Sequence, residues 1–349
     1  MTAETTTPAQ PTRPATIGTP GGRPGDLLLR VAAKRMLTPS VCELELRDRA
    51  GGDLPEHQPG SHLSMTTPAG QRRSYSITNP PTETSRYVIA VHRQQAGRGG
   101  SSSVVDDTVA GSLVWASAAS NAFELVDAPR YLLIAGGIGI TPLRSMLQHL
   151  IARGRRDVTL LYLTRTREET AYADELLALA QQPDLAHIVL LHHSASAGRA
   201  EFWPWLAVPD DGMHLYCCGS PALMEQVRAL TAHWRPSRVH FEDFAGVDAL
   251  GGTSAPFTLT WAPTGAQVAV AATETALQAL RRAGMSVTSS CESGTCGTCR
   301  LRLVDGSAEH RDLVLTAAER EHFVMPCVSR AAGSTMTVAP TESAEPPHA

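Results

Sequence analysis

The sequence lacks an apolar run long enough to cross a bilayer. Its longest apolar stretch, Tyr131 to Ile140, has about half of the roughly 20 residues that a spanning helix needs, and it contains three glycines. A formal net charge of −4 over 349 residues gives no electrostatic reason to expect nucleic-acid binding. Residues 1–25 have no apolar core of the signal-peptide kind and are rich in Thr, Pro and Gly, so we expect a disordered leader.

Other absences concern catalysis and metal binding. No G-x-S-x-G run occurs, which argues against a hydrolase with a nucleophile elbow. His192 and His193 end a predicted strand without an acid or cysteine at ligand spacing, so we expect no metal there. We expect Trp203 and Trp205 to pack their domain rather than to bind a ligand.

Four cysteines near the C-terminal end carry the strongest chemical signal. Cys291, Cys296 and Cys299 have the spacing C-x4-C-x2-C and Cys327 follows at a distance, which is the plant-type ligand pattern of a [2Fe–2S] cluster. Two glycines inside the run allow the loop to turn tightly around the metal. A structural zinc site is the alternative, but zinc ligands usually come as two paired knuckles. The three other cysteines fit a reducing compartment, so we expect a cytoplasmic protein.

Hydrophobic patterning divides the chain into three units, as its length allows. Residues 26–128 contain six short strands and one short helix, which predicts an antiparallel barrel. Residues 129–244 alternate strands with helices, which predicts a parallel α/β sheet. After a glycine-rich linker at 245–254, residues 255–340 predict a small α+β ferredoxin-like unit, and a disordered tail is expected at 341–349.

The barrel unit contains two candidate phosphate sites. The first is Arg73, Ser74, Tyr75 and Ser76 on one predicted strand: the arginine offers a fork of donors, the tyrosine a ring face and the serines hydroxyls. This set suits FMN, although an ordinary strand with alternating exposed residues is an alternative.

The second candidate is the run Arg98, Gly99, Gly100 and Ser101, just before a predicted helix. Glycines let the backbone approach an anion, and the free N–H groups of a helix start favour phosphate. A plain hairpin turn is the alternative. Together the two sites predict a flavin.

Two turns in the α/β unit end predicted strands at the same sheet edge. In the first, Gly136, Gly137 and Gly139 allow close approach of a ligand to a helix N-terminus, with Thr141 near the cap. This run is not G-x-G-x-x-G, so the glycines alone do not establish a dinucleotide fold. In the second turn, Cys218 is either a contact of a nicotinamide ring or a buried apolar thiol.

These motifs occur in register over residues 27–338, and the chain resembles the phthalate dioxygenase reductase family. The runs that carry the resemblance are RSYSITN, YVIAVHRQQAGRGGS, AGGIGITP, LYLTRTREETAYADEL, LYCCGSPALM, VHFEDF and SCESGTCGTC with the later EHRD and MPCVSRA. Vanillate demethylase reductases are close relatives of that family. The resemblance implies an FMN-binding β-barrel, then a Rossmann-like NAD module, then a C-terminal β-grasp ferredoxin domain.

The resemblance also implies site residues. Thr141 and Cys218 are the candidate catalytic residues. FMN would be held by Arg73, Ser74, Tyr75, Ser76, Ala90, Val91, His92, Arg98, Gly99, Gly100 and Ser101, with Thr141 and Phe244 near its ring. NADH would lie across Gly136, Gly137, Gly139, Cys218 and Gly219. The cluster ligands would be Cys291, Cys296, Cys299 and Cys327.

The chain departs from the family pattern at three places. His92 stands where relatives often have lysine, and Ser220 stands where proline is common. The run from Thr164 to Arg167 has two arginines and no acid to bind a ribose 2′-hydroxyl, which leaves NADPH open beside NADH.

The implied function is electron transfer from NADH through FMN to the cluster and then to an external acceptor. A flavin is needed because NADH gives two electrons as a hydride and the cluster takes one at a time. The expected acceptor is a Rieske-type terminal oxygenase or demethylase. The alternatives are a cytochrome P450 as acceptor and, outside catalysis, a redox sensor or passive electron carrier. We expect a monomer with no nucleic-acid or membrane partner.

Overall fold

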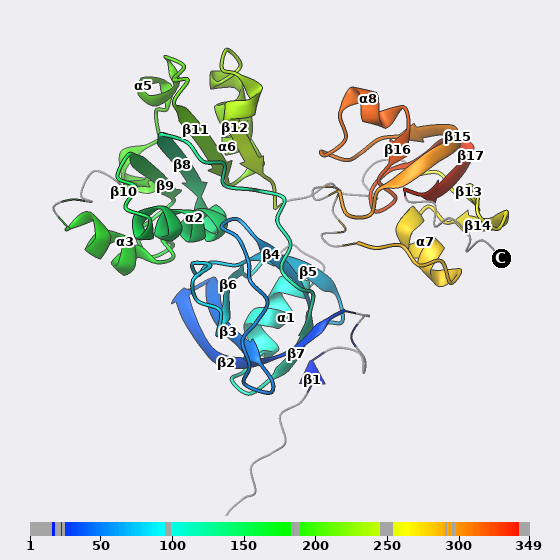
Figure 1. The fold of residues 1–349 in the computed structure, drawn as a ribbon, viewed down its shortest axis with the longest axis horizontal. Helices are drawn as coiled ribbons and strands as arrows, with labels where there is room; N and C mark the ends of the chain where they lie inside the picture. Colours follow the sequence, from blue (N-terminus) through cyan, green and yellow to red (C-terminus); the bar gives the residue numbers. More distant parts are fainter. Residues whose placement is uncertain are drawn as a thin grey trace, which may run out of the picture.

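The computed structural model describes most of the chain, and Figure 1 shows its fold. The described residues are 16–17, 22, 25–94, 99–182, 184, 189–244, 254–289, 292, 294 and 297–341. Three of the predicted site residues, Arg98, Cys291 and Cys296, lie outside them. Within these ranges, no helix is long and apolar enough to cross a membrane.

The first unit is an antiparallel sheet of order β5-β4-β7-β2-β3-β6 that packs on helix α1, as the strand pattern predicted (Figure 1). Alternation along β2 buries Leu29 and Val31, and Val104 and Val105 of α1 join the same core. The elements are β2 (Leu27–Thr38), β3 (Val41–Asp48), β4 (His62–Thr66), β5 (Arg72–Ser76), β6 (Tyr87–His92), α1 (Gly100–Asp107) and β7 (Leu113–Ala116). Strand β1 (Thr16–Ile17) pairs with β7 although it falls in the stretch expected to be disordered.

The second unit is a five-stranded parallel sheet of order β10-β9-β8-β11-β12. The order reverses between β8 and β11, and ligands of such sheets bind beyond the carboxyl ends of the strands at this point. Its strands are β8 (Arg130–Gly136), β9 (Val158–Thr164), β10 (Val189–His193), β11 (Met213–Cys218) and β12 (Val239–Glu242). Its helices are η1 (Gly137–Gly139), α2 (Ile140–Ala152), α3 (Ala173–Ala180), α4 (Ser194–Ala197), α5 (Trp203–Leu206), α6 (Pro221–Leu230) and η2 (Pro236–Arg238).

One local expectation in this unit is wrong. Trp203 and Trp205 are not packed inside, since 57% and 40% of their surfaces are exposed. Thr141 lies near the N-cap of α2, as the sequence predicted: the 3-10 turn η1 precedes the helix, Gly139 is the N-cap, and the Thr141 hydroxyl donates to the Ile138 carbonyl at 2.9 Å. Helix α3 begins directly after Tyr172, which is left-handed with φ 60°.

The third unit is a mixed sheet of order β14-β13-β17-β15-β16, in which β13 and β17 run parallel. Strands β13 and β14 form a hairpin, and Gly284, with φ 84°, follows the end of helix α7. The elements are β13 (Phe257–Trp261), β14 (Ala266–Val270), α7 (Ala276–Arg282), β15 (Leu301–Glu309), α8 (Ala317–Arg320), β16 (Phe323–Val324) and β17 (Arg330–Pro340). Its core is formed by residues between 257 and 338 and includes Cys299 and Cys327.

Candidate functional site

The two predicted phosphate sites of the barrel converge on one corner. A Cβ atom added to Gly100 would lie 3.2 Å from Arg73 Nε and 2.9 Å from Gln71 Oε1, so the arginine of β5 lies against the start of α1. Gly99 precedes the helix with φ 84°, and no side chain caps the first turn. A guanidinium beside uncapped helix amides is a donor set suited to a phosphate. Of the second run, Arg98 lies outside the described residues.

Strand β5 also carries two hydroxyl groups that have no hydrogen-bond partner in the part of the chain that the structure describes. These groups, the Tyr75 hydroxyl and Ser76 Oγ, are both buried. Burial raises the pKa of Tyr75, so the ring keeps its proton as a donor. Buried polar atoms are normally paired, and a polar ligand against β5 would satisfy both. Ser74 differs, because its Oγ is 2.9 Å from Ser64 Oγ of β4.

The neighbouring strand β6 exposes little side chain to such a ligand. Ala90 packs into the core shared with the parallel sheet and Val91 into the barrel core, while His92 is exposed at the strand end. Partial desolvation lowers the pKa of His92, which favours its neutral form at neutral pH. Contacts from Ala90 and Val91 to a flavin would therefore come from the backbone.

The glycine turn of β8 packs directly on the end of β11. A Cβ at Gly139 would lie 2.1 Å from the Cys218 carbonyl oxygen, and one at Gly136 would lie 3.3 Å from Gly219 Cα. A larger residue at Gly139 would force the backbone to move, whereas one at Gly136 would first displace the Leu223 side chain, 2.7 Å from the added Cβ. Cys218 itself is fully buried, and burial raises the pKa of its thiol well above the ordinary value. The two turns predicted to share an edge are thus in contact.

Glu242 is a candidate residue that the sequence reasoning missed. It pairs with Cys218 across β11 and β12, and its Oε2 is buried with no hydrogen-bond partner among the described residues. Burial raises the pKa of Glu242 to about 8, so the carboxyl is protonated at neutral pH. The available signal was an acid inside the predicted strand VHFE, whose residues are partly buried. Phe244 follows two residues later and is 39% exposed.

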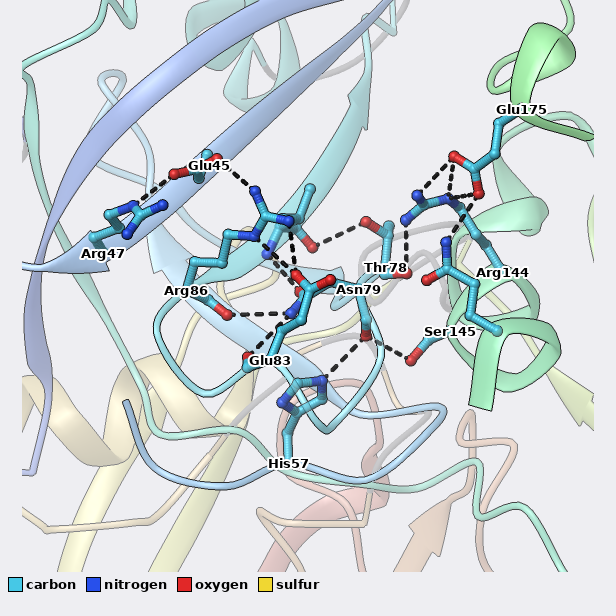
Figure 2. Close-up of polar contacts among 12 residues, drawn as sticks. Glu45, Arg47, His57, Thr78, Asn79, Glu83, Arg86, Arg144, Ser145 and Glu175 are labelled. Atoms are coloured by element: carbon cyan, nitrogen blue, oxygen red, sulfur yellow. Dashed lines mark hydrogen bonds and ion pairs between the residues drawn. The ribbon is translucent and has the colours of Figure 1, made fainter. Parts of the chain in front are cut away.

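A polar network joins the barrel to the nucleotide-binding unit, as Figure 2 shows. The backbone carbonyl of Asn79, directly after the RSYSIT segment, accepts from Ser145 Oγ of α2 at 2.9 Å and lies 3.2 Å from His57 Nε2. Arg144 of α2 donates to the Thr78 carbonyl at 2.9 Å and forms an ion pair with Glu175.

The Asn79 side chain fixes the barrel side of this network. Its Oδ1 accepts from the Val88 amide at 2.8 Å, and its Nδ2 donates to the Arg86 carbonyl at 3.2 Å. Since Asn79 is 2% exposed, these bonds are sheltered from water. The network holds the end of the β5 segment at a fixed place relative to α2, which begins at the glycine turn.

Two of the four predicted cluster ligands are described, and both are buried. Cys299 is 2% exposed and Cys327 is 1% exposed. A Cβ at Gly294, inside the ligand run, would lie 2.8 Å from Val328 Cγ2, so the run contacts the residue that follows Cys327. The Gly294 carbonyl also accepts from the Leu313 amide at 3.0 Å.

Asp312 of the EHRD run organises this region. It is 2% exposed, and its Oδ2 accepts from the Leu315 amide at 2.8 Å and the Val314 amide at 3.3 Å. The ligand run, the segment around Asp312 and the Cys327 segment therefore lie together. This arrangement fits a cluster held by thiolates from the run and from Cys327.

Comparisons with known proteins agree with this arrangement. Residues 133–229 match the oxidoreductase NAD-binding domain and residues 259–332 the 2Fe-2S iron-sulfur cluster binding domain. The chain is 41% identical to the phthalate 4,5-dioxygenase oxygenase reductase subunit of Pseudomonas putida over 89% of this chain and 95% of that one. The chain belongs to the phthalate dioxygenase reductase family. A solved phthalate dioxygenase reductase, described as a modular structure for electron transfer from pyridine nucleotides to [2Fe-2S], superposes with a TM-score of 0.75 at 40% identity, covering 90% of this chain and 98% of that one.

Membership in the family confirms the predicted fold class, cofactors and enzyme class. The protein is an oxidoreductase, the reductase component of an oxygenase system, and passes electrons from NADH through FMN to a [2Fe–2S] cluster. A self-sufficient cytochrome P450 monooxygenase contains a similar module, with a TM-score of 0.74 and 32% identity over 90% of this chain and 41% of that chain.

Proposed function

We propose that the external acceptor is a Rieske-type terminal oxygenase or demethylase, and that the residues described above hold the cofactors in the roles given below. The observation that carries the cofactor roles is the convergence of Arg73 with Gly100, on the strand whose Tyr75 and Ser76 hydroxyls have no hydrogen-bond partner among the described residues. Bound FMN accepts a hydride from NADH and passes the electrons on singly. The remaining chemistry is positioning.

In this proposal each part of the site has one task. Arg73 and the amides of residues 99–101 hold the flavin phosphate, and Tyr75 and Ser76 donate to the ring system. Gly136 and Gly139 let the turn after β8 pack on the end of β11, and this shared edge, with open space beside Gly137, would receive the nicotinamide.

Three further residues complete the proposed ring site. Cys218 and the protonated carboxyl of Glu242 line the nicotinamide position without carrying charge, and Phe244 covers the flavin. Thr141 is a positioning residue, because its hydroxyl is engaged by Ile138 and it is 2% exposed.

The cofactor assignment is tested by the visible spectrum, the extracted flavin and the iron content of the purified protein. We expect flavin absorption with a red-brown cluster shoulder, FMN rather than FAD on chromatography, and two iron atoms per chain, the number in a [2Fe–2S] cluster. Iron-free protein after attempted reconstitution would contradict the assignment. Rapid NADH-dependent reduction of cytochrome c would separate an enzyme from a passive carrier.

We further propose that the acceptor docks at the exposed edge of the cluster loop. Leu313 is 58% exposed although its amide is bonded to Gly294 of the ligand run. An exposed apolar side chain beside a redox centre is suited to contact a partner protein. Val304 of β15 is 47% exposed in the same unit and serves as the matched control.

Turnover with purified acceptors tests the partner. With a Rieske oxygenase, Leu313→Ser should raise the apparent KM for the acceptor several-fold, whereas Val304→Ser and the ferricyanide rate should stay unchanged. Equal effects of the two substitutions would reject the docking edge. Coupled turnover with a P450 and none with Rieske oxygenases would favour the alternative acceptor, which the similar module of the self-sufficient P450 supports.

We also propose that the protein is a monomer, which light scattering would measure. We propose a cytoplasmic location as well, supported by the buried free thiols of Cys42, Cys217 and Cys218.

A further inference from the structure

A three-point contact made by one arginine connects helix α7 to the cluster loop. Arg281 Nη1 donates to Glu292 Oε1 at 2.6 Å, and its Nη2 donates to the Val287 carbonyl at 3.2 Å and to Ser289 Oγ. Ser289 Oγ in turn donates to the same Glu292 oxygen at 2.7 Å. These groups, called the Arg281 network below, close a ring over the segment that leads into the ligand run.

Glu292 occupies a backbone conformation that an isolated chain avoids. Its φ is 52°, and among the described residues only Tyr172 is another non-glycine residue with positive φ. A left-handed glutamate is strained and persists only when its surroundings hold it. Glu292 directly follows Cys291, so the conformation of Glu292 sets the direction in which the chain leaves that predicted ligand.

The opposite side of the loop is held independently of Arg281. Gly294 is fixed by the Leu313 amide and by contact with Val328, and Gly297 faces Val314, all in the segments organised by Asp312. The Arg281 network is therefore the anchor at the entry of the loop, and the Asp312 segment is the anchor further along it.

Charge gives the network a second effect. The side chains of Arg281 and Glu292 are 28% and 26% exposed, so their charges are partly shielded from solvent. The positive charge of Arg281 offsets the negative charge of Glu292, which is adjacent in sequence to a ligand. Hydrogen bonds and charge near a cluster tune both its retention and its potential.

We propose that Arg281 is a positioning residue for the cluster: it holds Glu292, and thereby the Cys291 end of the loop, in the ligating conformation. The proposal rests on the assignment of Cys291 as a ligand. It adds a residue from helix α7, outside the cysteine motif, to those that determine cluster retention and potential.

The adjacent arginine provides a matched control. Arg282 pairs with Glu274 and is 59% exposed, so it presents the same side chain on the same helix, and none of its contacts with described residues reaches the loop. Arg281→Gln removes the network, Arg281→Lys keeps the charge without the fork of donors, and Glu292→Gln keeps an acceptor oxygen but removes its charge.

Iron loss from the anaerobic full-length holoprotein to a chelator is the first measurement. We expect loss about tenfold faster in Arg281→Gln than in the parent, an intermediate rate in Arg281→Lys and Glu292→Gln, and the parent rate in Arg282→Gln. The double variant Arg281→Gln with Glu292→Gln should lose iron no faster than Arg281→Gln alone, because one network is removed in both.

The potential of the cluster is the second measurement, and it separates positioning from general destabilisation. Arg281→Gln should lower the potential and Glu292→Gln should raise it, although both speed iron loss. Parent-like iron loss in Arg281→Gln, or equal effects of Arg281→Gln and Arg282→Gln, would overturn the proposal. If Arg281→Gln yields no holoprotein, Arg281→Lys takes its place in the measurement of the potential. We then expect a shift near zero in Arg281→Lys, which keeps the charge, and a raised potential in Glu292→Gln. Iron retained in Cys291→Ser would instead reject the ligand assignment itself.

Discussion

The barrel and the NAD module share a core, whereas the ferredoxin unit has its own. Val41 and Ala90 of the barrel pack in one cluster with residues of the parallel sheet, and the Asn79 and Arg144 network crosses the same junction. The core of the ferredoxin unit contains residues between 257 and 338 and none from the other two units within the described chain.

This difference matches the two kinds of transfer that the protein performs. Hydride transfer needs the reacting atoms within about 3–3.5 Å, so the flavin and nicotinamide sites must be held on one fixed body. A single electron needs no such contact between its donor and acceptor groups. A separately folded cluster unit is therefore sufficient for the second step, and the substitutions below test that independence.

The largest expected effect comes from removing a cluster ligand. Cys299→Ser should abolish NADH-dependent cytochrome c reduction and leave ferricyanide reduction through the flavin near the parent rate, because the flavin–NAD body does not use the ferredoxin core. Stopped-flow or steady-state assays with the two acceptors check this. Cys217→Ala, a buried thiol in the parallel sheet, is the control that should keep its iron. Loss of both activities in Cys299→Ser would show that the units depend on each other.

The next largest effect should come from the junction. Asn79→Ala leaves the Val88 amide and the carbonyls of Glu83 and Arg86 without their side-chain partner. In a buried site this loss lowers the free energy of unfolding by about 2–4 kcal/mol. We expect a lower midpoint for flavin release on heating and an unchanged rate of iron loss. Iron loss that follows flavin release would contradict separate stability of the two bodies.

Arg144→Met tests the same junction more gently. It removes the bond to the Thr78 carbonyl, the ion pair with Glu175 and the stacking of the guanidinium on Tyr172, 4.3 Å from the ring centre. The methionine keeps some packing, so we expect a loss of about 1–2 kcal/mol in the free energy of unfolding. Arg153→Met, at the exposed end of the same helix, should change little. Equal losses in the two variants would remove Arg144 from the junction.

For each pH unit, the smallest change in stability is the one that Glu242 contributes. Burial raises the pKa of Glu242 to about 8 from an ordinary value of 4.5, so the unfolded state releases this proton first. The stabilising contribution of the protonated carboxyl is complete below pH 4.5 and is lost as pH rises through 8, with a slope near 1 kcal/mol per pH unit between them. Glu242→Gln should flatten this slope in urea unfolding at pH 5 to 8. An unchanged slope would show that Glu242 does not carry the proton.

Sequence reasoning identified the units because their signals are local. Alternation along β2 and the glycine at 284 after a helical run each depend on neighbouring residues. The cysteine motif was recognised because its ligands are close in sequence.

What sequence reasoning missed depends on partners far along the chain. Glu242 is notable only because it pairs with the fully buried Cys218 of β11, and Asn79 only because α2 lies against it. The start of α3 follows from one left-handed residue, Tyr172, which carries no local signal for that conformation. The exposure of Trp203 and Trp205 likewise depends on tertiary packing.

The central claim is that electrons from NADH enter at the flavin–NAD body and leave through a separately folded cluster. Rapid anaerobic mixing of NADH with the oxidised holoprotein, followed at flavin and cluster wavelengths, tests it most directly. We predict that flavin absorbance falls first and cluster absorbance follows, and that only the first phase remains in Cys299→Ser. Cluster reduction that precedes the flavin phase, or an iron-replete cluster that NADH never reduces, would contradict the account.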